Sequence, residues 1–393
     1  MRQTFSFFEP THVLFGCGVL NDLHKQKMPG RKALLVISGG KSVIRNGYLD
    51  RTEKELEAAG VSFVLFNKVE ANPVKSTVEE GARTARENGC DFVVALGGGS
   101  VLDAAKIMAM FAPQPSDDLW DYAGGLTGKN KTLEKEPLPW IAIPTTAGTG
   151  SEVDANGVVT NPATNEKIGL GRMDSLFAKI AVVDPELTAS VPPKFTAFQG
   201  FDALFHSLEC HLSVNACAFS DMVTRSAIEN VGRYLVRAVK DGRDMEAREG
   251  MSFASMLGGY AMITSSCIGE HALEHAMSAY YPALPHGAGL IMISKAYFSH
   301  FVKLHCADDR FINMAKFLGK KDADRPEDFL EVLAALERDC GVDSLRMSDY
   351  GIRKEDAAKM ADNAIATTQR LLKFDPVPLT REECIRIYEE SWK

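Results

Sequence analysis

The sequence predicts an α/β amino-terminal domain, with a doubly wound and mostly parallel sheet, followed by an all-helical carboxyl-terminal domain. Three observations support this fold class. Short apolar runs alternate with amphipathic helical patterns through the first half of the chain. These runs are continuously apolar, as expected for parallel strands that are covered on both faces. After Pro192 and Pro193, long helical patterns follow one another without a strand between them.

In the first half, the elements are expected in the order β-α-β-α-β. Gly60 and Gly89 each follow a helical pattern directly, where glycine commonly ends a helix. Doubly wound folds bind their ligands at the carboxyl ends of the strands. The expected strands are 32–38, 61–66, 91–96, 139–144 and 180–183, and the expected helices are 50–59 and 74–88.

The second half shows long amphipathic patterns, such as residues 197–212 and 218–239. A chain of 393 residues exceeds the length at which one hydrophobic core stops growing, so two domains are expected. We place the boundary between residues 191 and 192, which gives a nucleotide-binding domain over 1–191 and a metal-binding domain over 192–393.

Composition and charge exclude several classes of protein. The net charge is −8 and no Lys/Arg block is long enough to follow a phosphate backbone, so nucleic-acid binding is not expected. No apolar run is long enough to span a membrane, and the first residues lack the apolar run of a signal peptide. Eight cysteines without a CxxC pair indicate reduced thiols and a cytoplasmic protein.

Two loops rich in small residues follow strands of the expected sheet. Gly97–Ser100 (GGGS) stands between strand 91–96 and a helical pattern, where free backbone N–H groups and the helix dipole can bind a phosphate. Asp103 in that helix is either a first-turn acid or a partner of a cofactor hydroxyl. Residues 144–152 (PTTAGTGSE) follow strand 139–144 and suit a diphosphate, a ribose or an ordinary turn.

Residues that commonly bind metals recur at helical spacing in the second half. Asp202 and His206 are four residues apart, and so are His271 and His275, so each pair faces one side of its helix. His286 follows in Pro-His-Gly, which predicts a tight turn that directs an imidazole back over the preceding helix. Five residues of the types that bind metals, on two helices and a turn, indicate a metal site, and one Asp with three His would suit Fe²⁺ or Zn²⁺.

Four motifs in this order and spacing resemble the iron-containing (group III) alcohol dehydrogenases. The motifs are GGGSVLDAAK, IPTTAGTGSEV, GFDALFHSLE and HALEHAMSAYYPALPHGAGL, and the resemblance covers nearly the whole chain. It implies the two-domain, dehydroquinate synthase-like architecture, a nicotinamide cofactor, a catalytic Fe²⁺ or Zn²⁺ and a dimer or larger homo-oligomer.

The resemblance also implies roles for individual residues. His275 matches the family's histidine near the nicotinamide ring and the substrate. The implied metal ligands are Asp202, His206, His271 and His286. The implied cofactor contacts are Gly98, Gly99 and Ser100 in the diphosphate loop, Thr145 and Thr146 in the second loop, and Asn156 and Lys167.

The loop after strand 32–38 bears on which nicotinamide is used. NAD-preferring enzymes place a carboxylate there that binds the adenosine 2′-hydroxyl and repels a 2′-phosphate. Here the loop has no Asp or Glu before Asp50, and a lysine and two serines suit a phosphate. It resembles the loop of NADPH-preferring members, which predicts NADP(H) with weaker use of NAD(H). The loop reads Ser38, Gly39, Gly40, Lys41 and Ser42.

The expected activity is hydride transfer between a small primary alcohol or diol and NAD(P). Glycerol dehydrogenase and dehydroquinate synthase are alternatives, because they share the two-domain plan and act on polyhydroxy substrates. A phosphorylated polyhydroxy acid would need several Lys/Arg near the metal, but residues 196–215 and 254–294 contain none. A small alcohol or aldehyde fits better. A metal- or nucleotide-binding protein without enzymatic activity is the third alternative.

Overall fold

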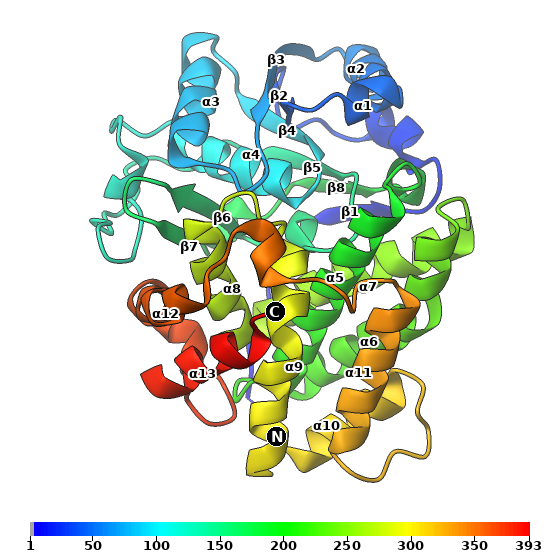
Figure 1. Cartoon of the computed structure of the whole chain (residues 1–393). Helices are drawn as coiled ribbons and strands as arrows, with labels where there is room; N and C mark the ends of the chain where they lie inside the picture. The colour runs from blue at the N-terminus through cyan, green and yellow to red at the C-terminus, as the bar shows by residue number, and fades with distance from the viewer. Residues whose placement is uncertain (1–3) are drawn as a thin grey trace. The chain divides into compact units, whose positions relative to one another are not determined.

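A parallel sheet and a bundle of helices form the centres of two units, which a computed structural model describes over residues 4–393 (Figure 1). The first unit, the α/β unit, comprises Phe8–Thr146 and Ser151–Ser190. The second, the helical unit, comprises Ala147–Gly150, Val191–Lys393 and the described residues up to Phe7. The predicted fold class is confirmed.

The sheet of the α/β unit has six strands in the order β1-β8-β5-β4-β2-β3, and every pairing between neighbours is parallel. Because the strands run the same way, all of their carboxyl ends lie at one edge. The strand order reverses between β2 and β4, so this is where a doubly wound sheet binds its ligand. The strands are β1 (His12–Phe15), β2 (Lys32–Ser38), β3 (Ser62–Val69), β4 (Phe92–Gly97), β5 (Trp140–Pro144) and β8 (Ile180–Val183).

Helices cover both faces of this sheet. On one face, Val43 of α1 (Ser42–Arg45) and Leu56 of α2 (Tyr48–Ala58) join a core cluster with alternate residues of β2, β4 and β5. On the other face, α3 (Lys75–Glu87) packs against α4 (Gly99–Phe111), and α4 packs on β4 and β5. This two-sided cover explains why the central strands are apolar at every position.

Three strands were not predicted from the sequence. The edge strand β1 follows the first residues of the chain and pairs with β8, which is remote in sequence. The antiparallel hairpin of β6 (Asn156–Asn161) and β7 (Glu166–Gly171) contains polar residues and glycines that resemble loop sequence. Asn165 has a φ of 53° in its turn, a conformation that asparagine tolerates better than most residues.

The helical unit contains only helices and loops within its described residues. Aromatic and aliphatic side chains from α5 through α13 form its main core cluster, in which Phe298 contacts Phe205, Phe311 and Phe329. The helices are α5 (Pro193–Leu212), α6 (Ala218–Lys240), α7 (Met245–Thr264), α8 (Gly269–Tyr280), α9 (His286–Leu304), α10 (Asp308–Phe317), α11 (Glu327–Asp339), α12 (Ala357–Leu372) and α13 (Arg381–Ser391).

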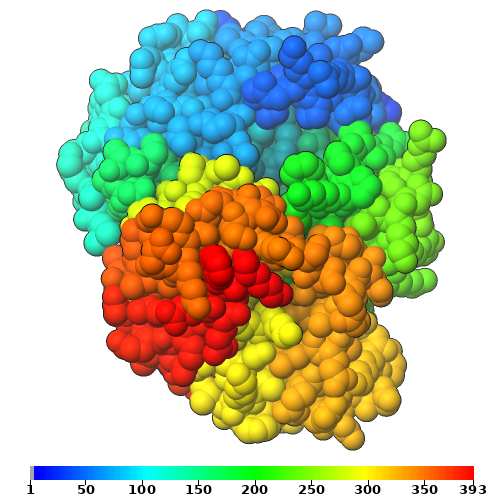
Figure 2. Space-filling view, viewed as in Figure 1, coloured from blue at the N-terminus to red at the C-terminus, as the bar shows by residue number. Residues whose placement is uncertain are grey.

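Helix α5 lies inside this unit, whereas the last helix lies at its surface. Pro193 occupies the first position of α5, where proline is preorganised for a helix and no N–H is needed. Every residue from Gly200 to Leu212 is buried, including Asp202 and His206. By contrast, α13 lies beside α12 on the face seen in the space-filling view (Figure 2). Polar groups on α5 are therefore withdrawn from water and need partners within the protein or a bound ligand.

Candidate metal centre and cofactor loops

Three helices of the helical unit bring the predicted metal-binding residues together. Asp202 and His206 lie one turn apart on α5, and His271 lies in the first turn of α8. His286 is the first residue of α9, with Pro285 as its N-cap, so the expected tight turn is instead a helix start. Pro285 has an extended backbone, and the helix begins directly after it. The imidazole of His286 is therefore directed toward the preceding helix, as was expected of a tight turn.

One carboxylate oxygen lies at the centre of this group. Asp202 Oδ1 is 3.4 Å from His206 Nδ1, 3.6 Å from His271 Nε2 and 3.5 Å from His286 Nε2. Tetrahedral ligand atoms bonded to a metal at about 2.0–2.1 Å lie about 3.3–3.4 Å apart. The separations from Asp202 therefore suit a single tetrahedral cation without rearrangement of the helices.

The same group contains polar atoms that the protein does not satisfy. Asp202 Oδ1, His206 Nδ1 and His271 Nε2 are buried and have no hydrogen-bond partner among the described residues. An unsatisfied buried polar atom costs about 1–3 kcal/mol. Three such atoms directed at one point are the arrangement that a bound cation would satisfy, so the residues present fit a divalent metal.

Two buried glutamates orient the imidazoles, and the sequence analysis missed both of them. Glu209 Oε1 accepts a hydrogen bond from His271 Nδ1, and Glu274 Oε2 accepts one from His286 Nδ1. A carboxylate only accepts, so each Nδ1 carries a proton and each Nε2 faces Asp202. A signal was present in the sequence, since each glutamate follows a predicted ligand by three residues in an otherwise apolar stretch.

The charges of the group shift its pKa values strongly. Burial alone would raise the pKa of Asp202, but the three neighbouring histidines lower it to about 2. Burial opposes protonation of His206, yet Asp202 raises its pKa to about 9. The pKa of His271 is also raised, because the attraction of Cys267 and Glu209 outweighs burial. The site thus favours positive charge beside Asp202, which a metal cation would supply.

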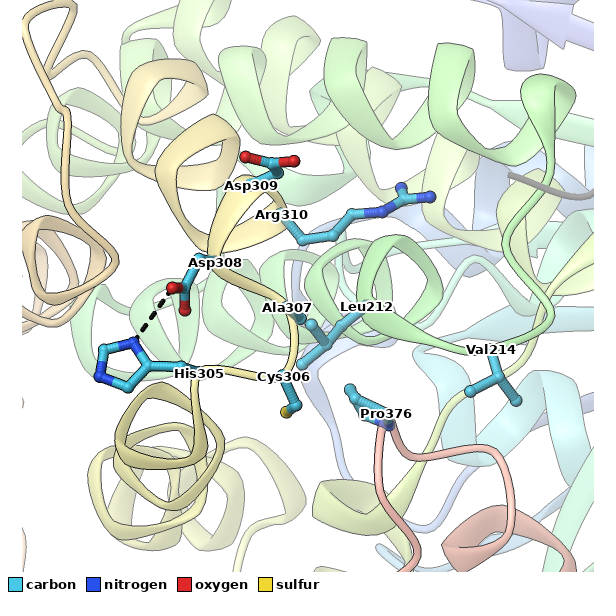
Figure 3. A pocket seen from close by; sticks show the side chains of 9 residues that line it. All are labelled: Leu212, Val214, His305, Cys306, Ala307, Asp308, Asp309, Arg310 and Pro376. Carbon is cyan, nitrogen blue, oxygen red and sulfur yellow. Dashed lines mark hydrogen bonds and ion pairs between the residues drawn. The ribbon is translucent and has the colours of Figure 1, made fainter.

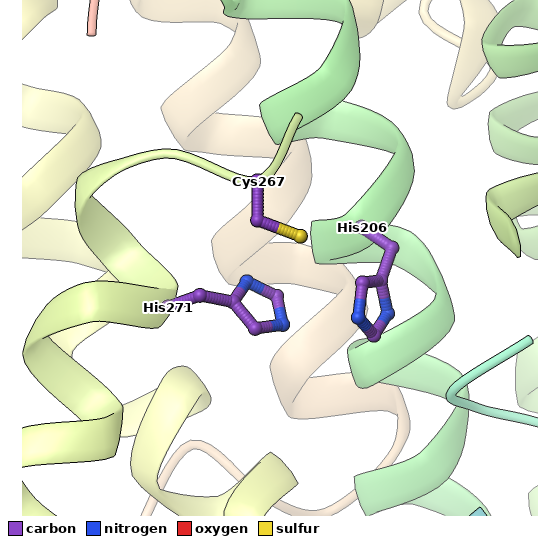
Figure 4. Close-up of side chains that lie close together, drawn as sticks. All are labelled: His206, Cys267 and His271. Carbon is purple, nitrogen blue, oxygen red and sulfur yellow. The ribbon is translucent and has the colours of Figure 1, made fainter. Parts of the chain in front are cut away.

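Two further side chains adjoin this group. His275 lies one turn after His271 on α8, and its ring centroid is 5.6 Å from that of His286. Ligand atoms of Glu274, His275 and His286 lie within 4.8 Å of one another. The thiol of Cys267 points toward His206 and His271, as Figure 4 shows. Cys267 was not predicted as a site residue, because it stands in a loop without a spacing relation to the histidines that a helix face would explain.

A short glycine-containing segment packs directly on the metal-binding helix. A Cβ on Gly148 would lie 2.9 Å from the carbonyl oxygen of Gln199 and 3.0 Å from Asp202 Oδ2. Gly150 N donates to Ser255 Oγ on α7 at 3.2 Å. Glycine at position 148 therefore permits a backbone approach to Asp202 that a larger residue would obstruct.

In the α/β unit, the two polar loops lie side by side at the carboxyl edge of the sheet. Gly98 is the N-cap of α4 and Gly99 its first residue, and Ser100 lies in its first turn. Thr145 N donates to Gly97 O at 2.9 Å, and a Cβ on Gly98 would lie 2.9 Å from Thr146 Cγ2. The backbone N–H groups at the start of this thirteen-residue helix thus lie beside Thr145 and Thr146 at one edge of the sheet.

The loop that precedes α1 stands on the other side of the strand-order reversal. Ser38 ends β2, and Gly39 N donates to Val69 O at 2.8 Å, which fixes the start of the loop against β3. Gly40, Lys41 and Ser42 are exposed. This segment presents one cation and hydroxyl groups to solvent.

The remaining predicted cofactor residues have hydrogen-bond partners within the α/β unit. Asp103 accepts from Ser151 Oγ at 2.6 Å and from Val158 N at 2.9 Å, and burial raises its pKa to about 6. Lys167 Nζ donates to Asn72 Oδ1 at 3.1 Å, and Asn72 N donates to Ser100 Oγ at 3.3 Å. The structure thereby links Lys167 to the glycine loop through Asn72. Asn156 Oδ1 accepts from Arg172 at 3.2 Å.

A hollow of about 480 Å³ in the helical unit involves none of the predicted residues. It lies where the connection from α9 to α10 passes the end of α5, and His305 Nδ1 pairs with Asp308 at its rim (Figure 3). Its lining residues include Leu212, Cys306 and Arg310. It is thus a surface feature separate from the histidine group.

Comparisons with known proteins identify the family. The model for iron-containing alcohol dehydrogenases matches residues 10–185, and that for the C-terminal part of the Fe-containing alcohol dehydrogenase family matches residues 196–392. The chain is 34% identical over 388 residues to long-chain-alcohol dehydrogenase 1 of Geobacillus thermodenitrificans, covering 97% of this chain and 95% of the relative. It is 31% identical over 372 residues to 1,3-propanediol dehydrogenase of Citrobacter freundii, covering 92% and 93%.

A solved structure agrees over the full length. The crystal structure of an alcohol dehydrogenase from an archaeal halo-thermophile of a Red Sea brine pool has a TM-score of 0.93 at 33% identity and covers 100% of both chains. Within the described residues, no helix has both the length and the apolar character needed to cross a membrane. Family membership implies an oxidoreductase with a metal and a nicotinamide cofactor. The chain belongs to the iron-containing alcohol dehydrogenase family.

Proposed function

We propose that this protein transfers a hydride between a small primary alcohol or diol and NADP, with NAD as a weaker alternative. The proposed metal ligands are Asp202, His206, His271 and His286, with Fe²⁺ or Zn²⁺ as the ion. The observation that carries the proposal is the placement of three histidine nitrogens 3.4–3.6 Å from Asp202 Oδ1.

The reaction is the balanced oxidation of an alcohol to an aldehyde, with a hydride passed to the oxidised cofactor and a proton released. When bound, the metal supplies Lewis-acid polarisation of the alcohol oxygen and the nicotinamide supplies the hydride acceptor. Glu209 and Glu274 keep the Nε2 atoms of His271 and His286 directed at Asp202, so the ligand set is held before the substrate arrives.

His275 is the proposed carrier of the proton that the alcohol loses. It is buried beside the histidine group, with its ring centroid 5.6 Å from that of His286 and 6.2 Å from that of His271. An imidazole there can hold a proton near neutral pH and pass it to solvent. Its role would be proton transfer without metal ligation.

The α/β unit provides the proposed cofactor contacts. The N–H groups of Gly98, Gly99 and Ser100 would bind the diphosphate beside Thr145 and Thr146. Asn156 and Lys167 complete the set, and Asp103 would act by holding Ser151 and β6 in place. The proposal of NADP rests on the loop from Ser38 to Ser42, where an exposed lysine and the absence of a carboxylate suit a 2′-phosphate.

We further propose a cytoplasmic enzyme that works as a dimer or larger homo-oligomer. The eight cysteines lie outside any disulfide in the part of the chain that the structure describes, and six of them are at least partly buried, which suits a reducing compartment. Light scattering after size-exclusion chromatography would measure the mass of the assembly. A monomer at micromolar concentration would contradict the oligomer.

The decisive experiment is a cofactor assay with defined metals. Purified protein, stripped of metal and reloaded with Fe²⁺ or Zn²⁺, is mixed with two- to six-carbon alcohols, diols and aldehydes and with each nicotinamide. We expect reduction of NADP⁺ with at least one primary alcohol or diol, dependent on the added metal. Turnover that persists fully in the metal-free protein, or no cofactor reduction with any substrate, would contradict the proposal.

A further inference from the structure

The connection between α7 and α8 places a thiol beside two of the proposed metal ligands. Ligand atoms of His206, Cys267 and His271 lie within 4.8 Å of one another. In the close-up view, the sulfur of Cys267 is directed into the space between the two imidazoles (Figure 4). His206 is 7% exposed and His271 3% exposed, so these rings are almost fully withdrawn from water.

One ring nitrogen of each of the two histidines is buried without a hydrogen bond, whatever the role of the cysteine. His206 Nδ1 and His271 Nε2 are buried without a hydrogen-bond partner among the described residues. The sulfur of Cys267 also contacts Met262 Sδ at 3.5 Å. A cation between the two imidazole rings would bind both nitrogens, and the sulfur of Cys267 would lie close enough to act as a further ligand.

The backbone around Cys267 is held in place on both sides. Before it, Ser265 Oγ donates to Cys210 O at 2.8 Å. After it, Ile268 N donates to Glu209 Oε2 at 2.5 Å and Gly269 N donates to Asp375 Oδ1 at 3.0 Å. Glu209 is also the carboxylate that orients His271, so one buried residue positions the imidazole and the cysteine together.

Three buried cysteines of the helical unit have a different setting. Cys340 and Cys384 belong to the main core cluster of the helical unit, and Cys210 belongs to a small cluster with Val223, Ala227 and Leu257. They therefore behave as small apolar residues. Of the cysteines in the described part of the chain, Cys267 is the one grouped with other potential metal ligands.

We propose that Cys267 is an additional metal ligand of this site, so that the centre has mixed oxygen, nitrogen and sulfur donors and prefers Zn²⁺ to Fe²⁺. The inference rests on the proposed metal site. On binding, the thiol loses its proton to solvent and a metal–sulfur bond forms. Thiolate donors favour Zn²⁺ over harder ions, and affinity already rises from Fe²⁺ to Zn²⁺ for nitrogen donors.

The distances permit this ligation after a small adjustment. Zinc can expand its shell to five ligands, and it binds sulfur at about 2.3 Å and imidazole nitrogen at about 2.0–2.1 Å, so neighbouring S···N separations are about 3.1–3.8 Å. The ligand atoms of His206, Cys267 and His271 lie at most 4.8 Å apart. Side-chain rotations that move each of these atoms by about 1 Å bring their separations into the range for a shared zinc ion. The anchored backbone need not move.

Cobalt substitution tests the proposal directly. The whole protein is loaded with Co²⁺, and its near-ultraviolet absorption is recorded for the unmodified chain, Cys267→Ser and Cys340→Ser. We expect a thiolate-to-cobalt charge-transfer band in the unmodified chain and in Cys340→Ser, and its loss in Cys267→Ser at equal cobalt content. A cobalt-loaded unmodified protein without this band would overturn the assignment of Cys267.

A second measurement does not depend on any variant folding. X-ray absorption at the zinc edge of the unmodified protein should show one sulfur neighbour at about 2.3 Å beside nitrogen and oxygen neighbours. Competition between Fe²⁺ and Zn²⁺ should favour zinc by at least about tenfold more than in Cys267→Ser. A shell of nitrogen and oxygen only would contradict the inference while leaving the metal site intact, whereas failure to bind Co²⁺ or Zn²⁺ at all would contradict the proposed function itself.

Discussion

The histidine group of the helical unit and the cofactor loops of the α/β unit present two different kinds of candidate site. In the histidine group, Asp202, His206 and His271 each direct an unsatisfied buried atom at one region. In the loops, Asp103 and Lys167 have hydrogen-bond partners within their own unit. A metal site is therefore recognisable by side-chain atoms that the fold leaves unpaired, and a nucleotide site by glycines and backbone N–H groups at strand ends.

The difference also concerns how each site tolerates substitution. The histidine group depends on the side chains of a few residues and on the close approach of Gly148 to Asp202. The loop at Gly39 has open space, since a Cβ there would meet no atom closer than 3.6 Å. Removing a side chain should therefore abolish metal binding in the histidine group. Adding a side chain at Gly39 should instead change which nicotinamide cofactor the loop prefers.

The largest effect is expected for His271→Ala. Loss of this ligand should remove the bound metal and lower kcat by roughly 10³-fold or more, because Lewis-acid stabilisation worth several kcal/mol disappears. Elemental analysis measures the metal and circular dichroism checks the fold. His211→Ala is the matched control, since His211 is equally buried on α5 but faces Thr224. Full metal occupancy in His271→Ala would remove this residue from the ligand set.

His275→Ala should separate proton transfer from metal binding. We expect the metal to stay bound while kcat falls roughly 10²–10⁴-fold, the usual contribution of a general acid–base group. His300→Ala, on a neighbouring helix, is the control. Unchanged turnover between pH 6 and pH 9 would show that the proton leaves by another route, and loss of metal would make His275 a ligand.

Glu209→Gln and Glu274→Gln should have an intermediate effect. Each removes the charge behind a ligand imidazole, and such changes typically weaken metal affinity by about 10–100-fold. Metal dissociation constants measured by chelator competition provide the readout. Glu337→Gln is the control, because Glu337 is partly buried and bonded to Ser294 outside the histidine group. Unaltered affinity in both site variants would mean that the two carboxylates do not tune the metal.

The smallest effect is expected in the α/β unit, for Gly39→Asp. A carboxylate there should repel the 2′-phosphate and favour NAD over NADP, by about tenfold or 1.4 kcal/mol. Steady-state kcat/KM with both cofactors measures the change, and Gly39→Asn controls for size without charge. A higher kcat/KM with NADH than with NADPH in the unmodified protein would show that the interpretation of this loop is wrong, although the family assignment would be unaffected.

Local patterns made part of this molecule predictable. The strands β2 and β8 were predicted at their observed ends, because continuous apolar runs bounded by glycine or aspartate leave little choice of structure. The spacing of Asp202 and His206, and of His271 and His275, predicted shared helix faces. Strand β1 and the hairpin β6–β7 escaped prediction. Strand β1 is defined by its pairing with β8, which is remote in sequence, and the polar residues and glycines of the hairpin resemble loop sequence.

The sequence by itself determined the fold class, the family and the residues that the candidate sites can use, because each follows from local periodicity or from motifs in order. Only the tertiary structure decided which atoms meet. It placed Asp202 Oδ1 among three imidazoles, put Glu209 and Glu274 behind two of them, and set Cys267 beside His206 and His271. These contacts join α5, α8 and α9, which are far apart in the sequence. The packing of the helices sets the geometry of the contacts, and packing between distant helices produces no local sequence pattern.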